Sequence, residues 1–574
     1  MIQQHVQRGD RTAFSFIRDA KNGEVSNTLT YRELDASARG IAARLTADGG
    51  PGQRVLLLFP DGLDFVKAFV GCLYAGAVAV PAPLPDRFRT AADRAAGILR
   101  DAGAGTVLTD RAHLDSVRAW LRAQGAPGTA CADAGTLAGT AETRSPPAPP
   151  PESLAFLQYT SGSTSEPKGV MVSHGNLLAN LESIHRTIGG TPELSAVGWL
   201  PVIHDMGLVG QLLSVLRAGG HLVLMPPNEF LRRPHRWLSL VQEFRATHTA
   251  APNFAFDLCL RRITDEQAAS LDLTSLEVVL NGAEPVRADT MAAFADRFAR
   301  AGFDPAAFSP CYGMAEATLF VSGSPRLEPP VTAAADPEAL AEGVLRPAAP
   351  GAAQRRLVSS GRPLGASVAI VDTGTGEVLP DGLVGEIRVR GAAVAQGYWR
   401  RGALTRETFG QTTAVPGAEE GWLRTGDLGA MRAGELFVTG RLKDVVIVGG
   451  RNLYPQDMEY VLQRADEHLL ADAGAVFGRT AGSADVVVVQ EARPVLFRSG
   501  DPEEVAGKIR RALAREFDIS PRTVLLTRPG TVRKTTSGKV RRSLMRQLFI
   551  DGALEGAGYR TDVPAGASAG QRGQ

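Results

Sequence analysis

The chain has 574 residues, 44% of them apolar, and its 62 basic residues balance 61 acidic ones to a net charge of +1. This length predicts about two to five domains or subdomains, and the apolar fraction excludes a mostly disordered chain. A net charge near zero provides no overall field to hold nucleic acid or an anionic membrane surface, so we expect neither as a partner.

Two features bear on where the protein works. Residues 1–14 lack the apolar core of a signal peptide, and the longest uncharged stretch, 68–85, is interrupted by glycines and prolines. We therefore expect no transmembrane segment. The chain has four cysteines, far apart and with no Cys-x-x-Cys pair. Together these features predict a cytoplasmic protein with reduced thiols.

Short apolar runs alternate with helical patterns through most of the chain, which is typical of an α/β fold. We expect strands at residues 55–59, 106–108, 154–159, 221–225 and 276–280, and helices at 176–185 and 288–301. A Pro/Ala-rich linker at 145–151 indicates a subdomain join. A second biased stretch at 325–354 is either an insertion or an exposed loop.

The pattern changes after about residue 441. We expect strands at 444–448 and 486–490, and helices at 455–464 and 503–517. In the last helix, apolar residues recur every four positions from Val505 to Phe517, so one face is buried. These elements predict a small α+β domain.

The domain prediction is therefore a large α/β N-terminal domain at 1–440 and a small mobile α+β domain at 441–551. The sequence from residue 552 onward is rich in Gly and Ala. Such a composition predicts a disordered tail at 552–574.

The first segment with candidate chemistry, residues 159–169, is rich in Thr, Ser and Gly and ends in Pro-Lys-Gly. Glycines let backbone N–H groups point into one concavity, and a lysine adds positive charge. This composition suits a loop that closes on a polyphosphate. A solvated hairpin turn is the alternative.

Four further segments follow at 311–318, 421–429, 439–455 and 533–542. Asp427, between glycines, could accept two hydrogen bonds from a ribose diol or cap a turn. The last segment is a basic, Gly-containing turn that leads into a helix. Each segment alone is a weak signal.

The five segments in this order resemble the signature motifs of the acyl-adenylate-forming superfamily, and the resemblance covers roughly residues 10–550. The chain is most similar to the fatty acyl-AMP ligases. Residues 199–208 (Trp-Leu-Pro-Val-Ile-His-Asp-Met-Gly-Leu) and 312–319 (Tyr-Gly-Met-Ala-Glu-Ala-Thr-Leu) carry this similarity. So does the spacer at about 325–357, where Tyr312 and Gly361 stand 49 positions apart, about twenty more than in ordinary acyl-CoA synthetases.

The resemblance implies roles for residues at matching positions. It implies that ATP and Mg²⁺ are the cofactors, with Glu316 holding the Mg²⁺ and Asp427, helped by Arg441, binding the ribose. Lys539 and Glu316 would be catalytic, with Lys539 reaching from the small domain to the fatty carboxylate and the α-phosphate. The β- and γ-phosphates would lie on Thr160, Ser161, Gly162, Ser163, Thr164 and Lys168. The adenine would be framed by Asn281, Gly282, Ala283, Glu284, Tyr312, Gly313 and Met314, with Tyr312 stacked on it.

The resemblance also implies a hinge and an acyl pocket. Lys443 falls at the hinge about which the small domain would rotate, although a plain surface lysine is the alternative. His204, Met206 and Gly207 would line the mouth of the acyl pocket.

The implied function is ATP-dependent activation of a medium- or long-chain fatty acid to acyl-adenylate. The acyl group would then pass to the phosphopantetheine arm of a separate acyl carrier protein, because the spacer at 325–357 would disfavour free CoA. A long-chain acyl-CoA synthetase is the runner-up. A non-catalytic relative that binds acyl or nucleotide ligands is a third reading.

Overall fold

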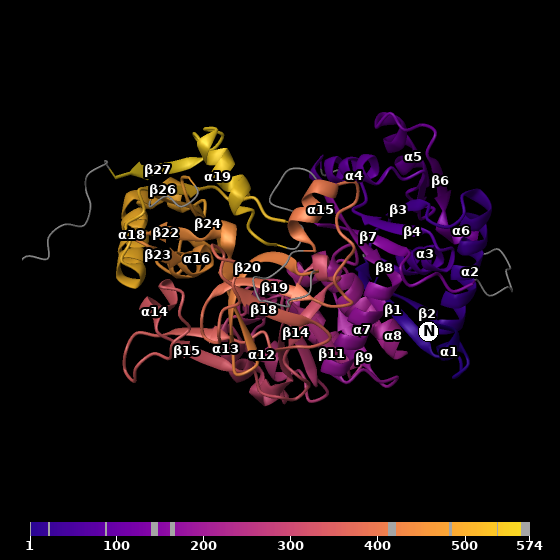
Figure 1. Cartoon of the computed structure of the whole chain (residues 1–574), viewed down its shortest axis with the longest axis horizontal. Helices are drawn as coiled ribbons and strands as arrows, with labels where there is room; N and C mark the ends of the chain where they lie inside the picture. The colour runs from indigo at the N-terminus through magenta and orange to yellow at the C-terminus, as the bar shows by residue number, and fades with distance from the viewer. Residues whose placement is uncertain are drawn as a thin grey trace, which may run out of the picture.

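The computed structural model describes residues 2–20, 23–85, 89–138, 147–160, 167–410, 421–480, 485–535 and 538–563. A large body built on three sheets carries a smaller domain at the C-terminal end of the chain, drawn in orange and yellow in Figure 1. Among the described residues, no helix is long and apolar enough to cross a membrane.

The first sheet has six strands in the order β6-β5-β3-β4-β7-β8. Its pairs are parallel except β7 with β8. In β3 the residues from Val55 to Leu58 are all buried, because helices cover both faces of a parallel sheet. The strands are β3 (Arg54–Leu58), β4 (Val78–Ala82), β5 (Thr106–Thr109), β6 (Ala130–Asp133), β7 (Leu154–Thr160) and β8 (Lys168–Ser173).

The second sheet has nine strands in the order β17-β14-β13-β12-β11-β9-β10-β1-β2. Its central pairs are parallel, and an antiparallel hairpin of β1 and β2 extends one edge. The strands are β1 (Thr12–Ala20), β2 (Gly23–Thr30), β9 (Ser195–Gly198), β10 (His221–Leu224), β11 (His248–Ala251), β12 (Val278–Asn281), β13 (Phe308–Gly313), β14 (Phe320–Gly323) and β17 (Arg362–Pro363).

A third, antiparallel sheet of four strands completes the large body. Its strands are β18 (Ser367–Val371), β19 (Gly385–Arg390), β20 (Leu423–Arg432) and β21 (Glu435–Arg441). Adjoining them is the hairpin β15 (Thr332–Ala335) and β16 (Arg355–Val358) with α14 (Pro337–Ala341) between its strands.

Helices pack on the sheets of the large body, and several begin with side-chain caps. Thr30 and Ser173 each form a capping box, which satisfies backbone N–H groups at the starts of α2 and α7. The larger helices are α2 (Tyr31–Asp48), α3 (Leu63–Tyr74), α4 (Arg89–Ala102), α5 (Leu114–Ala123), α7 (His174–Ile188), α10 (Pro234–Glu243), α11 (Asn253–Arg262) and α13 (Ala288–Phe298). The shorter ones are α1 (Ile2–Val6), α6 (Ala134–Ala138), α8 (Ser214–Ala218), α9 (Pro227–Arg232), α12 (Asp265–Ala269), α15 (Gly402–Thr408), the π-helix η1 (Met206–Leu213) and the 3₁₀ turns η2 (Ala299–Ala301), η3 (Pro305–Ala307) and η4 (Ala315–Ala317).

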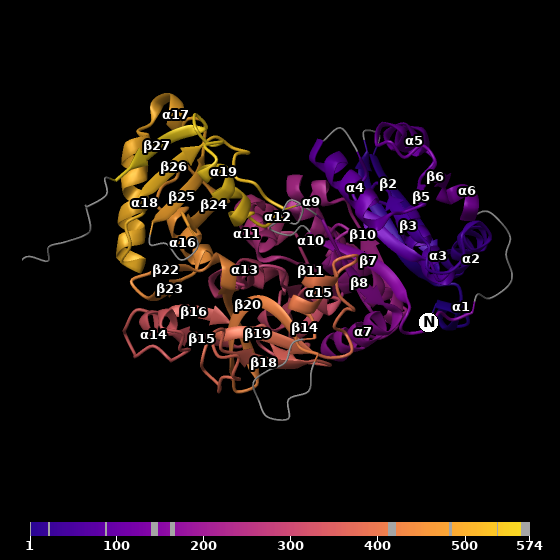
Figure 2. The same ribbon diagram turned by 45° about the horizontal axis from the view of Figure 1, so that its top comes forward.

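The smaller domain has a two-stranded hairpin and a sheet in the order β24-β25-β26-β27. As the sequence predicts, Val505, Ile509 and Leu513 of its long helix α18 are buried. Figure 2 shows this domain at the upper left, away from the six-stranded sheet at the right. Its elements are β22 (Val446–Val448), β23 (Arg451–Leu453), α16 (Pro455–Leu462), β24 (Leu469–Gly478), β25 (Val486–Ala492), α17 (Leu496–Ser499), α18 (Pro502–Phe517), β26 (Thr523–Thr527), α19 (Arg542–Ile550) and β27 (Gly558–Asp562).

The 3₁₀ turn η5 (Leu442–Asp444) joins β21 of the large body to β22 of the small domain. Lys443, the predicted hinge residue, lies in this turn. The boundary expected between residues 440 and 441 falls one residue inside β21, which ends at Arg441.

Two predictions about irregular sequence are corrected. The prediction of a disordered tail from residue 552 is wrong for 552–563, because β27 pairs with β26 and Leu554 is buried. The stretch at 325–354 is not merely an exposed loop. It contains the strand β15 and the helix α14, which bury Ala335 and Leu340 against Phe437 of the third sheet.

Candidate active site

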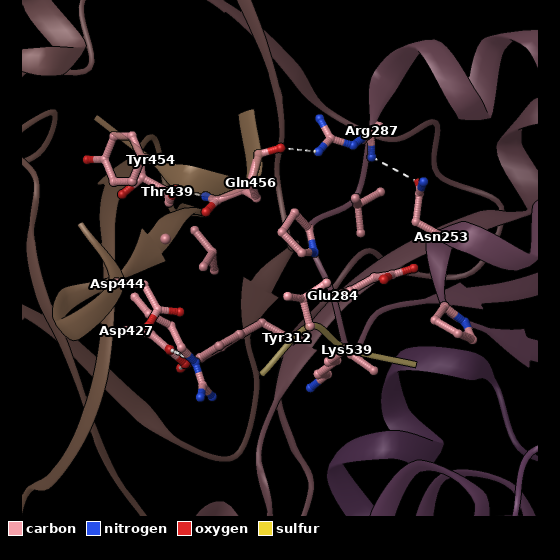
Figure 3. Close-up of a pocket in the computed structure, with 18 of the residues that line it drawn as sticks. Asn253, Glu284, Arg287, Tyr312, Asp427, Thr439, Asp444, Tyr454, Gln456 and Lys539 are labelled. Atoms are coloured by element: carbon pink, nitrogen blue, oxygen red, sulfur yellow. Dashed lines mark hydrogen bonds and ion pairs between the residues drawn. The ribbon is translucent and has the colours of Figure 1, made fainter. Parts of the chain in front are cut away.

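A cleft of about 2330 Å³ lies between the large body and the small domain (Figure 3). Most of the predicted site residues line it, although they come from all parts of the chain. Those residues are Thr160, Lys168, His204, Met206, Gly207, Ala283, Glu284, Tyr312, Gly313, Met314, Glu316, Asp427, Arg441, Lys443 and Lys539.

Two predicted residues of the described part of the chain, Asn281 and Gly282, are not among those that line the cleft. Asn281 is fully buried at the end of β12, and its side-chain amide has no hydrogen-bond partner in the described part of the chain. Gly282 backs onto Cys311, where a Cβ would stand 2.8 Å from the sulfur. The predicted phosphate-loop residues Ser161, Gly162, Ser163 and Thr164 lie outside the described residues.

Asp427 is the centre of a polar triad in which its own carboxylate is buried, Tyr312 is half-buried and Arg441 is about half exposed. It stands on β20 opposite Arg441 of β21, and the Arg441 Nε donates to its Oδ1 at 3.0 Å. The Tyr312 hydroxyl donates to its Oδ2 at 2.8 Å. Asp427 raises the pKa of the Arg441 guanidinium. Burial, with Asp427 adding to it, raises the pKa of Tyr312 well above its usual value. The triad therefore places a fixed carboxylate beside an aromatic ring, which suits a nucleoside.

The backbone around Tyr312 permits close packing. A Cβ at Gly313 would stand 1.8 Å from the Leu319 carbonyl oxygen, so only glycine fits. Just after the neighbouring strand β12, Ala283 has a positive φ of 67°, a conformation unusual for a residue with a Cβ. Both positions lie in the wall of the cleft beside Tyr312.

Glu316 lies in η4, directly after the Tyr312 strand, and is half-buried in the cleft wall. The Tyr398 hydroxyl donates to its Oε1 at 2.7 Å. The described residues contain no cluster of three or more side chains that could hold a metal. Mg²⁺ in nucleotide sites commonly takes one or two carboxylates plus phosphate oxygens, so this single carboxylate fits such a cation.

Lys168 begins β8 and pairs with Thr160 of β7, which flanks the phosphate-loop segment. Its ammonium lies 5.8 Å from the centre of the Tyr398 ring. Lys443 of η5 also lines the cleft, and its pKa is lowered by burial and by the positive charges of Arg441 and Lys168. Positive charge therefore gathers at the end of the cleft where phosphates are expected.

Lys539 reaches the cleft from the small domain. Its turn is closed by the Thr535 hydroxyl, which accepts from the Lys539 N–H at 3.1 Å. A Cβ at the preceding Gly538 would stand 3.6 Å from the Phe254 ring, so Gly538 lies against the large body. Desolvation, with Arg441 adding to it, lowers the pKa of Lys539. Figure 3 draws Lys539 in the same part of the pocket as Glu284 and Tyr312.

Glu284 accepts a hydrogen bond from the Phe254 N–H at 2.6 Å, at the first turn of α11. Desolvation raises the pKa of its carboxyl from 4.5 to about 7. The carboxyl is easier to ionise in the unfolded chain than in the folded one. Its ionisation therefore lowers the free energy of unfolding as the pH rises from 4.5 through about 7.

Replacing Glu284 with glutamine should remove this pH dependence, because Gln keeps an acceptor for Phe254 but does not ionise. Each pKa unit corresponds to about 1.4 kcal/mol, and a half-buried group retains part of it. We expect Glu284→Gln to be more stable than the parent by about 1–2 kcal/mol at pH 8 and equal to it at pH 4.5. Thermal unfolding at both pH values checks this, and an equal difference at both would contradict it.

His204, Met206 and Gly207 lie together at the start of η1, a π-helix, a form often found at functional sites. A Cβ at Gly207 would stand 2.3 Å from the Pro201 carbonyl oxygen, so glycine is needed here for close packing. Burial, with Arg94 and Lys539 adding to it, lowers the pKa of His204 to about 3, so the ring is neutral at pH 7.

An aromatic cluster supports the wall next to this segment. Trp199 stacks on Phe230 with ring centres 3.9 Å apart, and Phe254 meets Trp199 edge-on at 6.0 Å. Around the same cleft, the apolar lining includes Ile184, Leu200, Leu258, Leu280 and Leu319. Such a lining suits an acyl chain.

Sequence reasoning missed three residues around the cleft. Tyr398 contacts both Glu316 and Lys168. Arg287 donates to the Gln456 carbonyl of the small domain at 2.9 Å (Figure 3). Arg355 pairs with Asp457 of the small domain at 2.6 Å. No local pattern marks the two arginines, since their partners lie more than 100 positions away.

A scan against family models matches residues 2–399 to the AMP-binding enzymes. A medium-chain-fatty-acid–[acyl-carrier-protein] ligase of Moorena producens is 40% identical over 95% of this chain and 93% of its own length. A long-chain-fatty-acid–AMP ligase of Mycobacterium marinum is 38% identical over 94% and 95%. The solved fatty acyl-adenylate ligase of L. pneumophila, in complex with acyl adenylate and pyrophosphate, is 32% identical, covers 98% of this chain and 97% of its own, and has a TM-score of 0.73.

Proposed function

Since the chain belongs to the AMP-binding enzymes and, within them, to the fatty acyl-AMP ligases, we propose that it activates a medium- or long-chain fatty acid with ATP. The products are acyl-AMP and pyrophosphate. The acyl group then passes to the phosphopantetheine thiol of a separate acyl carrier protein. With four unpaired cysteines, the protein works in the cytoplasm.

One observation carries this proposal: a single cleft brings the Asp427 triad, Glu316, Lys168 and Lys539 together beside an apolar wall. The ribose hydroxyls donate to Asp427, and the adenine stacks on Tyr312. Lys168 holds the β- and γ-phosphates together with the loop that precedes it. His204, Met206 and Gly207 line the entrance to the acyl pocket, where a neutral imidazole adds no charge.

In the first step an oxygen of the fatty carboxylate attacks the α-phosphorus, and pyrophosphate leaves. Negative charge develops between the carboxylate and the α-phosphate, and Lys539 stabilises it from the small domain. Glu316 holds Mg²⁺, which neutralises phosphate charge when it is bound. In the second step the carrier thiolate attacks the acyl carbonyl and AMP leaves, after the small domain has turned about Lys443.

Mass spectrometry of the products from Mg-ATP and dodecanoic acid, with and without CoA, tests the proposal. Acyl-AMP that persists when CoA is added is the expected result. Prompt conversion to acyl-CoA would make the protein an acyl-CoA synthetase. Failure to exchange pyrophosphate into ATP with any fatty acid would favour the non-catalytic reading.

The hairpin at 332–358 supports a carrier protein over free CoA as the acceptor, because it contacts the small domain. Arg355 of β16 pairs with Asp457 of α16, and its guanidinium lies 5.0 Å from the centre of the Tyr454 ring. Both charged side chains are about one-fifth exposed. The contact therefore holds the small domain in the position seen here.

Replacing Arg355 with alanine should release this restraint and increase acyl-CoA formation about fivefold. This factor corresponds to the loss of an ion pair that contributes about 1 kcal/mol. The ratio of acyl-CoA to acyl-AMP measures it. Arg356→Ala is the matched control, because the neighbouring arginine pairs with Asp289 of the large body instead. An unchanged ratio in Arg355→Ala would show that this contact has no part in acceptor choice.

A further inference from the structure

The segment 397–401 lies against the strand that begins with Lys168. The Met171 N–H donates to the Gly397 carbonyl at 2.9 Å, and the Trp399 N–H donates to the Gly169 carbonyl at 2.8 Å. Tyr398 itself forms a β-bridge with Val170. These backbone bonds fix the position of Tyr398 relative to the start of β8.

The same segment is anchored on its other side. Arg401 donates to Oδ1 of Asp101 at 3.4 Å and to the Pro167 carbonyl at 3.5 Å. Asp101 also accepts from the Tyr159 hydroxyl at 2.6 Å. Segment 397–401 is therefore held to both strands that flank the phosphate loop.

The Tyr398 side chain contacts two groups of the proposed site. Its hydroxyl donates to Glu316 Oε1 at 2.7 Å, and its ring face lies 5.8 Å from the Lys168 ammonium. The ring is only 7% exposed and meets Phe409 edge-on, with ring centres 5.3 Å apart. A ring packed this way has little freedom to move, so its hydroxyl is a fixed donor.

We propose that Tyr398 is a positioning residue for divalent-cation binding: its hydroxyl orients the Glu316 carboxylate while its ring face sets the place of Lys168. This rests on the proposed function, in which Glu316 holds Mg²⁺. A carboxylate on a flexible side chain has several orientations, and one fixed donor selects among them. Hydrogen bonds of this kind to ligating carboxylates commonly affect metal affinity 10- to 100-fold.

A single tyrosine side chain thus positions two charged groups, Lys168 and Glu316. In the proposed function Lys168 would contact the phosphates and Glu316 would hold the cation that accompanies them. Because Tyr398 contacts both, it fixes the distance between the positive and the negative side chain before ATP arrives. Such preorganisation avoids rearrangement when the nucleotide binds.

The test compares Tyr398→Phe with Tyr74→Phe in the full chain. Tyr74 is the matched control, since its hydroxyl donates to Asp35 at the same 2.7 Å but lies on α3, away from the cleft. Phenylalanine keeps the ring and removes only the donor. Calorimetry without fatty acid gives the affinity for ATP in EDTA and the affinity for ATP with Mn²⁺. The affinity with Mn²⁺ divided by the affinity in EDTA measures the contribution of the cation.

We expect Tyr398→Phe to reduce this ratio at least tenfold, with ATP binding in EDTA changed less than twofold, and Tyr74→Phe to change neither. In a Glu316→Gln background, Tyr398→Phe should add less than twofold, because the two residues act through one contact. The Mg²⁺ concentration that half-saturates pyrophosphate exchange should rise by the same factor.

Three results would overturn the proposal: an unchanged ratio, an equal loss of ATP binding in EDTA, or a Tyr398→Phe chain that does not fold while Tyr74→Phe does. The last would make Tyr398 purely structural. A parent chain that binds Mn²⁺ with ATP but exchanges no pyrophosphate would contradict the proposed function and leave the cation effect measurable.

Discussion

Replacing Lys539 with alanine should reduce acyl-AMP formation by about 10²–10³-fold while the fold is kept. Its side chain is exposed to the cleft, so its loss removes charge without opening a cavity in a core. Removing one preorganised group that stabilises transition-state charge typically costs about 3–4 kcal/mol. Fatty-acid-dependent pyrophosphate exchange measures the rate, and thermal unfolding checks the fold.

Lys508→Ala is the control for charge removal in the small domain. Lys508 lies on α18, pairs with Asp466 and is absent from the cleft lining. We expect its exchange rate to stay within about twofold of the parent, since Lys508 pairs with Asp466 and Glu504 and does not line the cleft. Near-normal adenylation by Lys539→Ala would reject the catalytic role given to that residue.

Replacing Asp427 with asparagine should lower kcat/KM for ATP about 100-fold. The carboxylate accepts from both Tyr312 and Arg441, and it is 6% exposed. Asn offers one neutral acceptor to these partners and to the ribose, and each charged hydrogen bond lost costs about 1.5–3 kcal/mol. Steady-state kinetics with varied ATP measure the loss.

Two comparisons make this prediction specific to the ribose. The parent should discriminate against 2′-deoxy-ATP, and Asp427→Asn should largely lose that discrimination. Asp35→Asn is the matched control, because Asp35 also accepts from an arginine Nε and a tyrosine hydroxyl, at 2.7 Å each, on the far helices α2 and α3. If Asp427→Asn still discriminated like the parent, the ribose contact would lie elsewhere.

The buried strands were the most predictable part of the fold. Residues 55–59 and 154–159 are expected as strands and appear as β3 and β7 to within one residue at each end. Continuous apolar runs between turn residues determine such strands locally, because both faces are covered. The strand β27 was missed, since its Gly558-Tyr-Arg-Thr-Asp562 sequence becomes a strand only through pairing with β26.

The candidate site was predictable where motifs mark it and not where tertiary contacts build it. Tyr312, Glu316, Asp427 and Lys539 lie in one cleft, as the order of the motifs implies. Asn281 belongs to such a motif but is buried behind the wall. Tyr398 was not singled out, because a single tyrosine carries no pattern until the fold brings it 2.7 Å from Glu316, 82 positions earlier in the chain.

The hairpin of β1 and β2 has a consequence for synthesis on the ribosome. β1 is the second-to-last strand of the nine-stranded sheet and pairs in parallel with β10, with Phe14 opposite Leu222. At about 5–20 residues per second, β10 is made roughly 10–40 s after β1. All strands of the six-stranded sheet, residues 54–173, emerge in that interval. The first strand of the chain thus waits with Phe14 and Phe16 uncovered, a binding surface for chaperones until its partner arrives.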